Sequence, residues 1–277
     1  MRRYHLVALM KKKLGIIGCG AMGRLIGLHV LDSLSSLYEL TAVSSRTPEH
    51  ALALGKELHV RALSAEQLIA ECDMVVEAAS ASAMPGIVRS CLAAHKEVLC
   101  LSVGGFALDD SLLDDVMAQE TLVHVPSGAV AGLDGISALK EIGLDSLSVT
   151  TVKRPESLGI SDLSALPAVE EGNASSEARL VFDGSAHEAI RRFPANVNIA
   201  IALSLAGNGF NDTRVRLIAD PQAKGTRHHI VARAGACALD ITATPTPLKE
   251  NPRSSALAMY SIPSLLRQLA GPLRLAG

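Results

Sequence analysis

The stretch Lys13-Leu14-Gly15-Ile16-Ile17-Gly18-Cys19-Gly20-Ala21-Met22-Gly23 decides the fold. An apolar run that suits a buried parallel strand leads directly into a Gly-x-Gly-x-x-Gly turn, and the apolar spacing of residues 24–31 predicts a helix. Each glycine has a mechanical role in this order. Gly18 makes the tight turn, Gly20 lets the backbone approach a pyrophosphate, and Gly23 lets the helix pack close to the strand.

The first turn of that helix is the expected phosphate site. Its backbone N–H groups and the positive end of its dipole favour anions. The residues between the glycines are therefore also candidates for binding the cofactor phosphates. The expected cofactor-binding residues of this stretch are Gly18, Gly20, Ala21, Met22 and Gly23. The N-terminal part of the chain is therefore interpreted as a Rossmann unit that binds NADP or NAD.

The choice between the two cofactors depends on the end of the second predicted strand, residues 38–44. An Asp or Glu about 20 residues past the glycines usually binds the ribose hydroxyls of NAD. This chain has Ser44-Ser45-Arg46-Thr47 there. Hydroxyls and a guanidinium would bind a 2′-phosphate that a carboxylate would repel. Ser45 and Arg46 therefore favour NADP, or the use of both cofactors; alternatively, Arg46 stacks over adenine or faces solvent.

Strands continue to alternate with helices as far as Pro126, which predicts a doubly wound parallel sheet. Its ligand crevice should lie beyond the carboxyl ends of the strands, where Ala79 leaves room for the cofactor. The expected helices are residues 64–69, which carry a capping signal, and 81–94; the further strands are 72–80, 97–103 and 121–125.

The pattern changes after Pro126. Residues 127–134 are expected to form the beginning of a glycine-punctuated helix, and a helix at 199–206 and several strand-like runs follow. The sequence predicts an α/β protein with a Rossmann domain at 1–127 and a second α/β domain, with a mixed or antiparallel sheet, at 128–252. A C-terminal helical segment, 253–277, should pack back onto the first domain, with Asn251-Pro252 as a helix start. The expected strands of the second domain are 147–153, 177–182, 215–220, 229–233 and 238–244.

Composition excludes several functional classes. Hydrophobic residues make up 48% of the 277 residues, but no apolar run approaches the roughly 18 residues of a membrane span. A net charge of −2 and a pI near 6.5 give no basic footprint for nucleic acid. Five scattered cysteines lack metal-ligand spacing, so we expect no metal site and a cytoplasmic location with reduced thiols.

Four further phrases, together with the glycine turn, resemble the L-aspartate dehydrogenase family, in the family's order and at similar spacing. They are Pro126-Ser-Gly-Ala-Val-Ala-Gly-Leu-Asp134, Phe193-Pro-Ala-Asn-Val-Asn198, Ala219-Asp-Pro221 with His228 seven residues later, and Asn251-Pro-Arg-Ser-Ser-Ala-Leu-Ala258. The resemblance implies a dimer-forming second domain, a homodimer or larger homo-oligomer, and oxidation of L-aspartate to iminoaspartate with a nicotinamide cofactor. The imine then hydrolyses to oxaloacetate and ammonia or feeds quinolinate and pyridine nucleotide synthesis.

The resemblance also implies roles for individual residues. Ala129 matches a backbone contact to the cofactor, and Asn196 or Asn198 matches a cofactor-contacting Asn. His228 matches the catalytic His of a phrase that the family writes Asn-x-His-Glu-Ile and that reads Thr226-Arg-His-His-Ile230 here. On an extended segment, His228 and His229 would point to opposite faces, so only one of them can act.

Substrate binding needs partners for two carboxylates. Ser127, Ser254 and Ser255 are the expected polar contacts, the last two at a helix N-terminus that favours anions. The basic candidates are Lys153, Arg227 and Arg253. Competing interpretations are a homoserine dehydrogenase, a dihydrodipicolinate reductase-like enzyme, or a non-catalytic sensor of NAD(P). The reductase's lysine-rich phrase is absent from the sequence.

Overall fold

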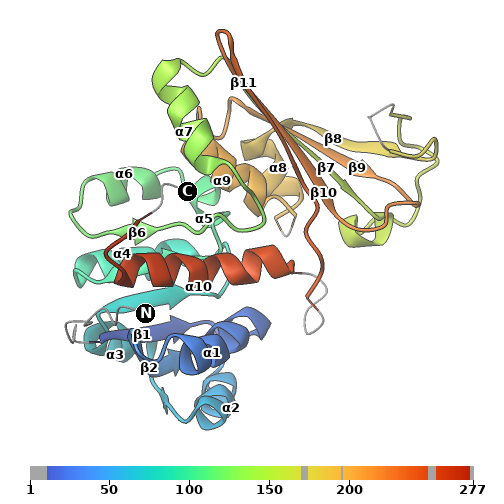
Figure 1. Cartoon of the computed structure of the whole chain (residues 1–277). Helices are drawn as coiled ribbons and strands as arrows, with labels where there is room; N and C mark the ends of the chain where they lie inside the picture. The colour runs from blue at the N-terminus through green and yellow to red at the C-terminus, as the bar shows by residue number, and fades with distance from the viewer. Residues whose placement is uncertain (1–10, 170–173, 195, 249–253, 275–277) are drawn as a thin grey trace, which may run out of the picture. The chain divides into compact units, whose positions relative to one another are not determined.

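The computed structural model describes residues 11–169, 174–194, 196–248 and 254–274, which form two compact units (Figure 1). The first unit contains residues 11–101, 112–124 and 262–274. The second contains residues 102–111 and the described part of 125–261. Asn251 and Pro252, the expected helix start, lie outside the described residues.

The first unit is built on a six-stranded sheet in which every pairing is parallel. The strand order is β3-β2-β1-β4-β5-β6, so the order reverses between β1 and β4, and the carboxyl ends of these two strands flank the ligand position of a Rossmann fold. The strands are β1 (Lys12–Ile17), β2 (Tyr38–Ser44), β3 (Arg61–Ala62), β4 (Met74–Glu77), β5 (Glu97–Cys100) and β6 (Val123–His124).

Helices cover both faces of this sheet because its strands are apolar on both sides. Leu14 and Ile16 are fully buried in a core to which α1, α2 and the second half of α10 contribute. Gly15 points the other way, where a side chain would collide with Leu68 of α3. The helices are α1 (Ala21–Ser33), α2 (Pro48–Leu58), α3 (Ala65–Glu71), α4 (Met84–Ala93), α6 (Leu112–Met117) and α10 (Ala256–Ala270).

A buried hydrogen bond attaches α10 to this unit. The Tyr38 hydroxyl, at the start of β2, donates to the Leu266 carbonyl oxygen at 2.8 Å. Burial, with a smaller contribution from the Glu97 charge, raises the pKa of Tyr38 to about 12, so the hydroxyl keeps its proton. Residues 262–274, which include the second half of α10, accordingly belong to the first unit.

The second unit holds a five-stranded mixed sheet in the order β11-β10-β7-β9-β8. β7 and β9 are parallel, and the other pairs are antiparallel. The strands are β7 (Ser146–Lys153), β8 (Arg179–Ser185), β9 (Thr213–Ala219), β10 (Arg227–Ala234) and β11 (Cys237–Ala243). Helices α7 (Leu133–Ile142), α8 (Ala186–Arg192) and α9 (Asn198–Ala206) lie along one face of the sheet (Figure 1).

Several expected bounds were wrong. The helix expected within 127–134 begins only at Leu133, because Gly128 and Gly132 adopt φ of 66° and 82°, in the left-handed region. Helix α4 begins at Met84 rather than at residue 81, and β5 ends at Cys100. The capping box at Ser64 and Gln67, by contrast, is confirmed. Four helices, α2, α5 (Gly105–Leu108), α6 and α8, and strand β3 were not predicted from the sequence.

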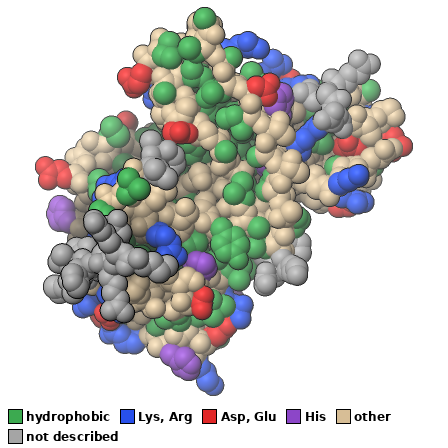
Figure 2. Space-filling view, viewed as in Figure 1, with side chains coloured by type: hydrophobic (Ala, Val, Ile, Leu, Met, Phe, Trp, Pro, Cys, Tyr) green, Lys and Arg blue, Asp and Glu red, His purple; other side chains and the backbone are tan. Residues whose placement is uncertain are grey.

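No helix among the described residues combines the length and apolarity required to cross a membrane. On the face in Figure 2, Lys and Arg side chains are interspersed with Asp and Glu and form no single basic patch.

Three ionisable side chains meet near the amino ends of β1 and β5. Glu97 accepts from Lys12 at 2.7 Å and lies 3.2 Å from Nε2 of His124. Burial opposes ionisation of Glu97, but the hydrogen bonds from Lys12 and His124 outweigh it and lower the pKa of the carboxyl. Because its pKa is lower in the folded state, Glu97 stabilises the fold above its ordinary pKa, and this contribution is lost as the pH falls.

Glu97→Gln should therefore lower the free energy of unfolding at pH 7 by about 1 kcal/mol, the upper part of the range for exposed ion pairs. The difference should shrink as the pH falls below about 4.3, where the carboxyl of the unfolded chain takes up its proton while that of the folded protein still holds its charge. Urea unfolding at pH 7 and pH 4 measures both values. An equal loss at the two pH values would show that the charge of Glu97 contributes nothing.

Candidate functional site

The glycine turn has the geometry of a dinucleotide cradle. Gly18 has φ of 118°, and a side chain there would collide with the backbone of Ala78. A side chain at Gly23 would collide with the Gly18 carbonyl oxygen, so α1 can lie this close to β1 only with glycine at this position. At Gly20, the residue before α1, an added Cβ meets nothing within 4 Å. The turn is thus tight on its protein side and open where a pyrophosphate would approach, which fits NAD or NADP.

The ends of β2 and β4 adjoin this turn. The Gly18 amide donates to the carbonyl oxygen of buried Ser44 at 2.8 Å. Ser45 is half-buried, with its hydroxyl accepting from the Thr47 amide at 3.3 Å, whereas Arg46 is exposed. Both residues precede the N-terminus of α2.

A buried carboxylate orders the turn after β4. Glu77 is fully buried, and its Oε1 accepts from the amide of Ala79 at 2.8 Å. Ala79 itself is exposed. The sequence analysis missed the role of Glu77, although a lone Glu ending an apolar strand is a signal that could have been used.

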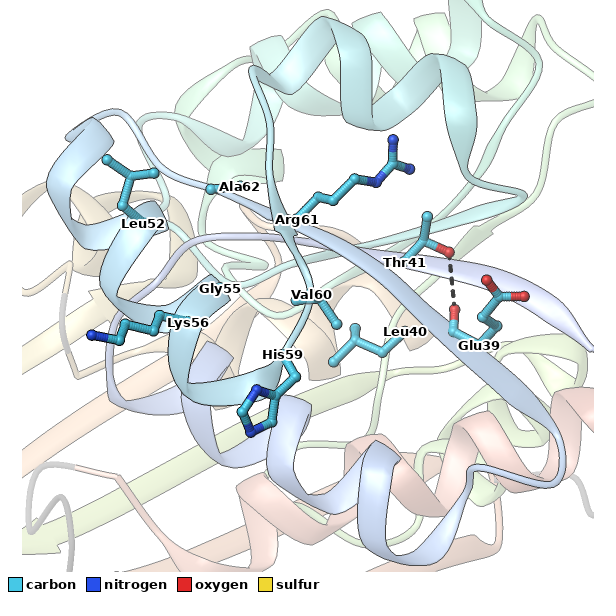
Figure 3. Close-up of a pocket in the computed structure, with 10 residues that line it drawn as sticks. All are labelled: Glu39, Leu40, Thr41, Leu52, Gly55, Lys56, His59, Val60, Arg61 and Ala62. Carbon is cyan, nitrogen blue, oxygen red and sulfur yellow. Dashed lines mark hydrogen bonds between the residues drawn. The ribbon is translucent and has the colours of Figure 1, made fainter.

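A pocket of about 560 Å³ lies at the other end of β2 and is not this site (Figure 3). Leu40 and Val60 point into it, while the charged ends of Lys56 and Arg61 point away from each other. No expected site residue lines it. Because ligands of such sheets bind beyond the carboxyl ends of the strands, the pocket is on the wrong side. Its lining residues are Glu39, Leu40, Thr41, Leu52, Gly55, Lys56, His59, Val60, Arg61 and Ala62.

In the second unit, β10 carries both adjacent histidines. His228 is 3% exposed and faces the helix-covered side of the sheet, where its Nδ1 lies 2.9 Å from the Thr151 hydroxyl of β7. His229 lies on the opposite side and contacts Asp240 at 2.9 Å. Burial, and then the nearby charge of Lys153, lower the pKa of His228 to about 3, so the free protein holds a neutral imidazole at pH 7. The expected division of the two side chains between opposite faces is confirmed.

The two asparagines have different surroundings. The Asn196 side chain is half-buried and accepts a hydrogen bond from Nζ of Lys153 at 2.8 Å. Asn198 is the exposed first residue of α9. The structure therefore places Asn196, but not Asn198, in a cluster of polar side chains on β7 and its neighbours.

Some of the serines expected to bind substrate lie in segments that already make hydrogen bonds within the protein. The Ser255 hydroxyl accepts from the Ala258 amide at 3.0 Å and so acts as a helix cap. Ser127 begins the loop that leads to buried Ala129, and the Gly128 amide of this loop donates to the Ser261 hydroxyl at 3.2 Å. Ser254 precedes α10. Among the described residues, no group of three or more His, Cys, Asp or Glu could hold a metal ion.

Comparisons with known proteins match both units. Residues 134–269 match the family model "Aspartate dehydrogenase, C-terminal", and residues 18–125 match "Homoserine dehydrogenase, NAD binding domain". The chain is 36% identical to an L-aspartate dehydrogenase of Methanosarcina mazei, over 95% of this chain and 98% of that protein.

Two solved structures show the same fold. An aspartate dehydrogenase from Thermotoga maritima aligns with a TM-score of 0.73 and 24% identity, over 95% of this chain and 99% of that chain. GenD2 from gentamicin A biosynthesis, in complex with NAD, aligns with a TM-score of 0.53 and 14% identity, over 98% of this chain and 88% of that chain.

Proposed function

The chain belongs to the L-aspartate dehydrogenase family, and we propose that it catalyses the NAD(P)-dependent oxidation of L-aspartate. The observation that carries the proposal is the pairing, in one chain, of an open glycine turn with a buried neutral histidine in the family-specific half. The first supplies a place for the dinucleotide. The second supplies a group that can take up a proton.

A nicotinamide ring bound to the first unit would accept the hydride from Cα of the substrate. His228 then handles the proton. In the tautomer with hydrogen on Nδ1, the Thr151 hydroxyl accepts that hydrogen, and Nε2 keeps the lone pair that can remove a proton. We infer that this Nε2 takes the proton from the substrate amine or from the water that attacks the imine.

The remaining details of the reaction are also proposals. Iminoaspartate is the first product, and it either hydrolyses to oxaloacetate and ammonia or feeds pyridine nucleotide synthesis through quinolinate. We propose Ser127, Ser254 and Ser255 as polar substrate contacts, and Ala129 with Asn196 or Asn198 as cofactor contacts.

A cytoplasmic location is supported by the five cysteines, all of which are free thiols.

A homodimer is supported by the sheet of the second unit. Helices α7, α8 and α9 pack against one face of this sheet. On the other face, Val152 and Ile218 are buried together with Ala178 of the same chain, and ion pairs occupy the exposed part: Arg214 with Asp183 at 2.7 Å, and His229 with Asp240 at 2.9 Å. We propose that a second copy stacks on this opposite face.

A homoserine dehydrogenase is the main alternative. Only the first unit matches a model named for that enzyme, whereas the second unit, which carries His228 and Asn196, matches aspartate dehydrogenase. A homoserine dehydrogenase would therefore explain the match of the cofactor-binding unit but not the match of the unit proposed to bind the amino-acid substrate.

The substrate is tested by initial rates of NAD(P)H formation across L-amino acids. L-Aspartate should exceed L-glutamate by about 100-fold in kcat/KM, because one extra methylene shifts a carboxylate or the Cα–H by about 1 Å from its partner. Comparable values for the two acids would contradict a four-carbon diacid substrate. Activity with L-homoserine alone would favour the alternative.

The cofactor preference is tested at Arg46. We expect NADP to work at least as well as NAD, and Arg46→Asp to shift the ratio of kcat/KM values toward NAD. The substitution removes a partner of the 2′-phosphate and adds a repelling carboxylate. Arg191→Asp, at an exposed position in the last turn of α8, serves as a charge control. A wild-type enzyme that is already a hundredfold better with NAD would refute the interpretation of Ser45 and Arg46.

The two histidines should differ sharply. His228→Ala should reduce kcat by about 10²–10⁴-fold, the usual range for acid–base catalysis, and His229→Ala by at most about tenfold. Dissociation constants for NADPH, measured by fluorescence, should stay unchanged in both variants. If His229→Ala is the inactive variant, the assignment of the catalytic histidine is off by one residue.

A further inference from the structure

Lys153 is a half-buried cation beside the proposed catalytic histidine. It is the last residue of β7, two positions after Thr151, so their side chains share one face of the sheet. Thr151 is paired with His228 in the register of β7 and β10. Lys153, Thr151 and His228 therefore lie together on the helix-covered face. The Lys153 charge accordingly adds to burial in lowering the pKa of His228.

The ammonium group of Lys153 has one neutral partner. It donates to Oδ1 of Asn196 at 2.8 Å, and an ammonium has three hydrogens to donate. Among the described residues, no carboxylate lies within ion-pair distance of it. Burial lowers the pKa of Lys153, as expected for a cation that has lost water without gaining an anion.

The carboxylate of neighbouring Asp220 is directed away from Lys153. Asp220 follows Ala219, the residue that pairs with Lys153 on β9, and its amide donates to the Lys153 carbonyl oxygen at 2.8 Å. Its carboxylate, however, accepts from the Ser175 hydroxyl at 2.6 Å and from the amides of Ser175 and Gln222. Asp220 is thus used to hold loops together, not to neutralise Lys153.

Arg227, another basic candidate, does not reach this face. Arg227 pairs with Val152, so it points to the side opposite His228. Arg253 lies outside the described residues. Of the two basic candidates among the described residues, Lys153 and Arg227, Lys153 is the one that the fold brings to the histidine.

We propose that Lys153 binds one carboxylate of the L-aspartate substrate, with Asn196 holding the ammonium in place. This inference rests on the proposed function. A partly desolvated ammonium attracts a carboxylate far more strongly than one in water does. The bound carboxylate would also offset the charge that depresses the pKa of His228, so the imidazole would become a better proton acceptor once the substrate is present.

The test compares Lys153→Met with Lys153→Arg and with Lys140→Met, the same substitution at an exposed position of the same unit. Lys153→Met should raise KM for L-aspartate by about 10- to 100-fold, the usual worth of a hydrogen bond to a charged group. Lys153→Arg should recover part of this loss, and Lys140→Met should match wild type. Calorimetric titration of succinate into NADPH-saturated protein should show the same order of dissociation constants, without any turnover.

L-Asparagine identifies which carboxylate is bound, because it keeps the α-carboxylate and lacks the β-carboxylate. If Lys153→Met loses the preference for L-aspartate over L-asparagine, the β-carboxylate is the partner. If Lys153→Met loses activity with L-aspartate and L-asparagine by equal factors, the α-carboxylate is the partner of Lys153. KM values and succinate affinities within threefold of wild type would overturn the proposal.

Two controls separate this proposal from its premise. A wild-type protein that neither oxidises L-aspartate nor binds succinate would refute the proposed function itself. If Lys153→Met also loses NADPH binding, Lys153→Gln takes its place, since its amide can still donate to Asn196. That variant must show the same weakening for succinate with normal NADPH affinity; unchanged succinate binding would again overturn the role of Lys153.

Discussion

The first unit depends on the close approach of helix α1 to strand β1 at Gly23 and Gly18. The absence of a side chain at Gly23 lets the helix begin directly over the carbonyl of Gly18, and the tight turn at Gly18 directs the chain past Ala78 at the end of β4. Together they set the start of α1 at the point where the strand order reverses. A larger residue at either position would move the helix N-terminus, and with it the amides that favour a phosphate.

The first unit could be predicted well because its signals are local. Buried parallel strands are continuous apolar runs, and the glycine spacing identifies the turn after β1. Helix α2 was missed because seven of its eleven residues are exposed and mixed with charge, and two-residue β3 is too short to produce a pattern. The start of the helix predicted over 127–134 was wrong for a conformational reason. An apolar run does not reveal that Gly128 and Gly132 adopt φ in the left-handed region, which prevents a helix from beginning there.

The site was less accessible to sequence reasoning because it depends on strand register. Thr151 and His228 are 77 positions apart and meet only because β7 and β10 pair in one particular alignment. No periodicity within either strand specifies that alignment to the residue. The contact between Lys153 and Asn196 could not be predicted for a similar reason. Each residue was a candidate by itself, but the hydrogen bond joins the end of a strand to the loop before α9. Resemblance to a family could select His228, yet it carried no information about the partner that orients it.

The hydrogen bond from Tyr38 to Leu266 has a consequence for synthesis of the chain. Its two ends are 228 positions apart, and Ile262 and Leu266 complete a core whose other members all precede residue 100. A ribosome delivers the whole second unit before it delivers those two side chains. The nucleotide-binding half, although it is made first, therefore leaves apolar surface uncovered throughout elongation and finishes folding last, so the nascent polypeptide is exposed to aggregation until the final helix emerges.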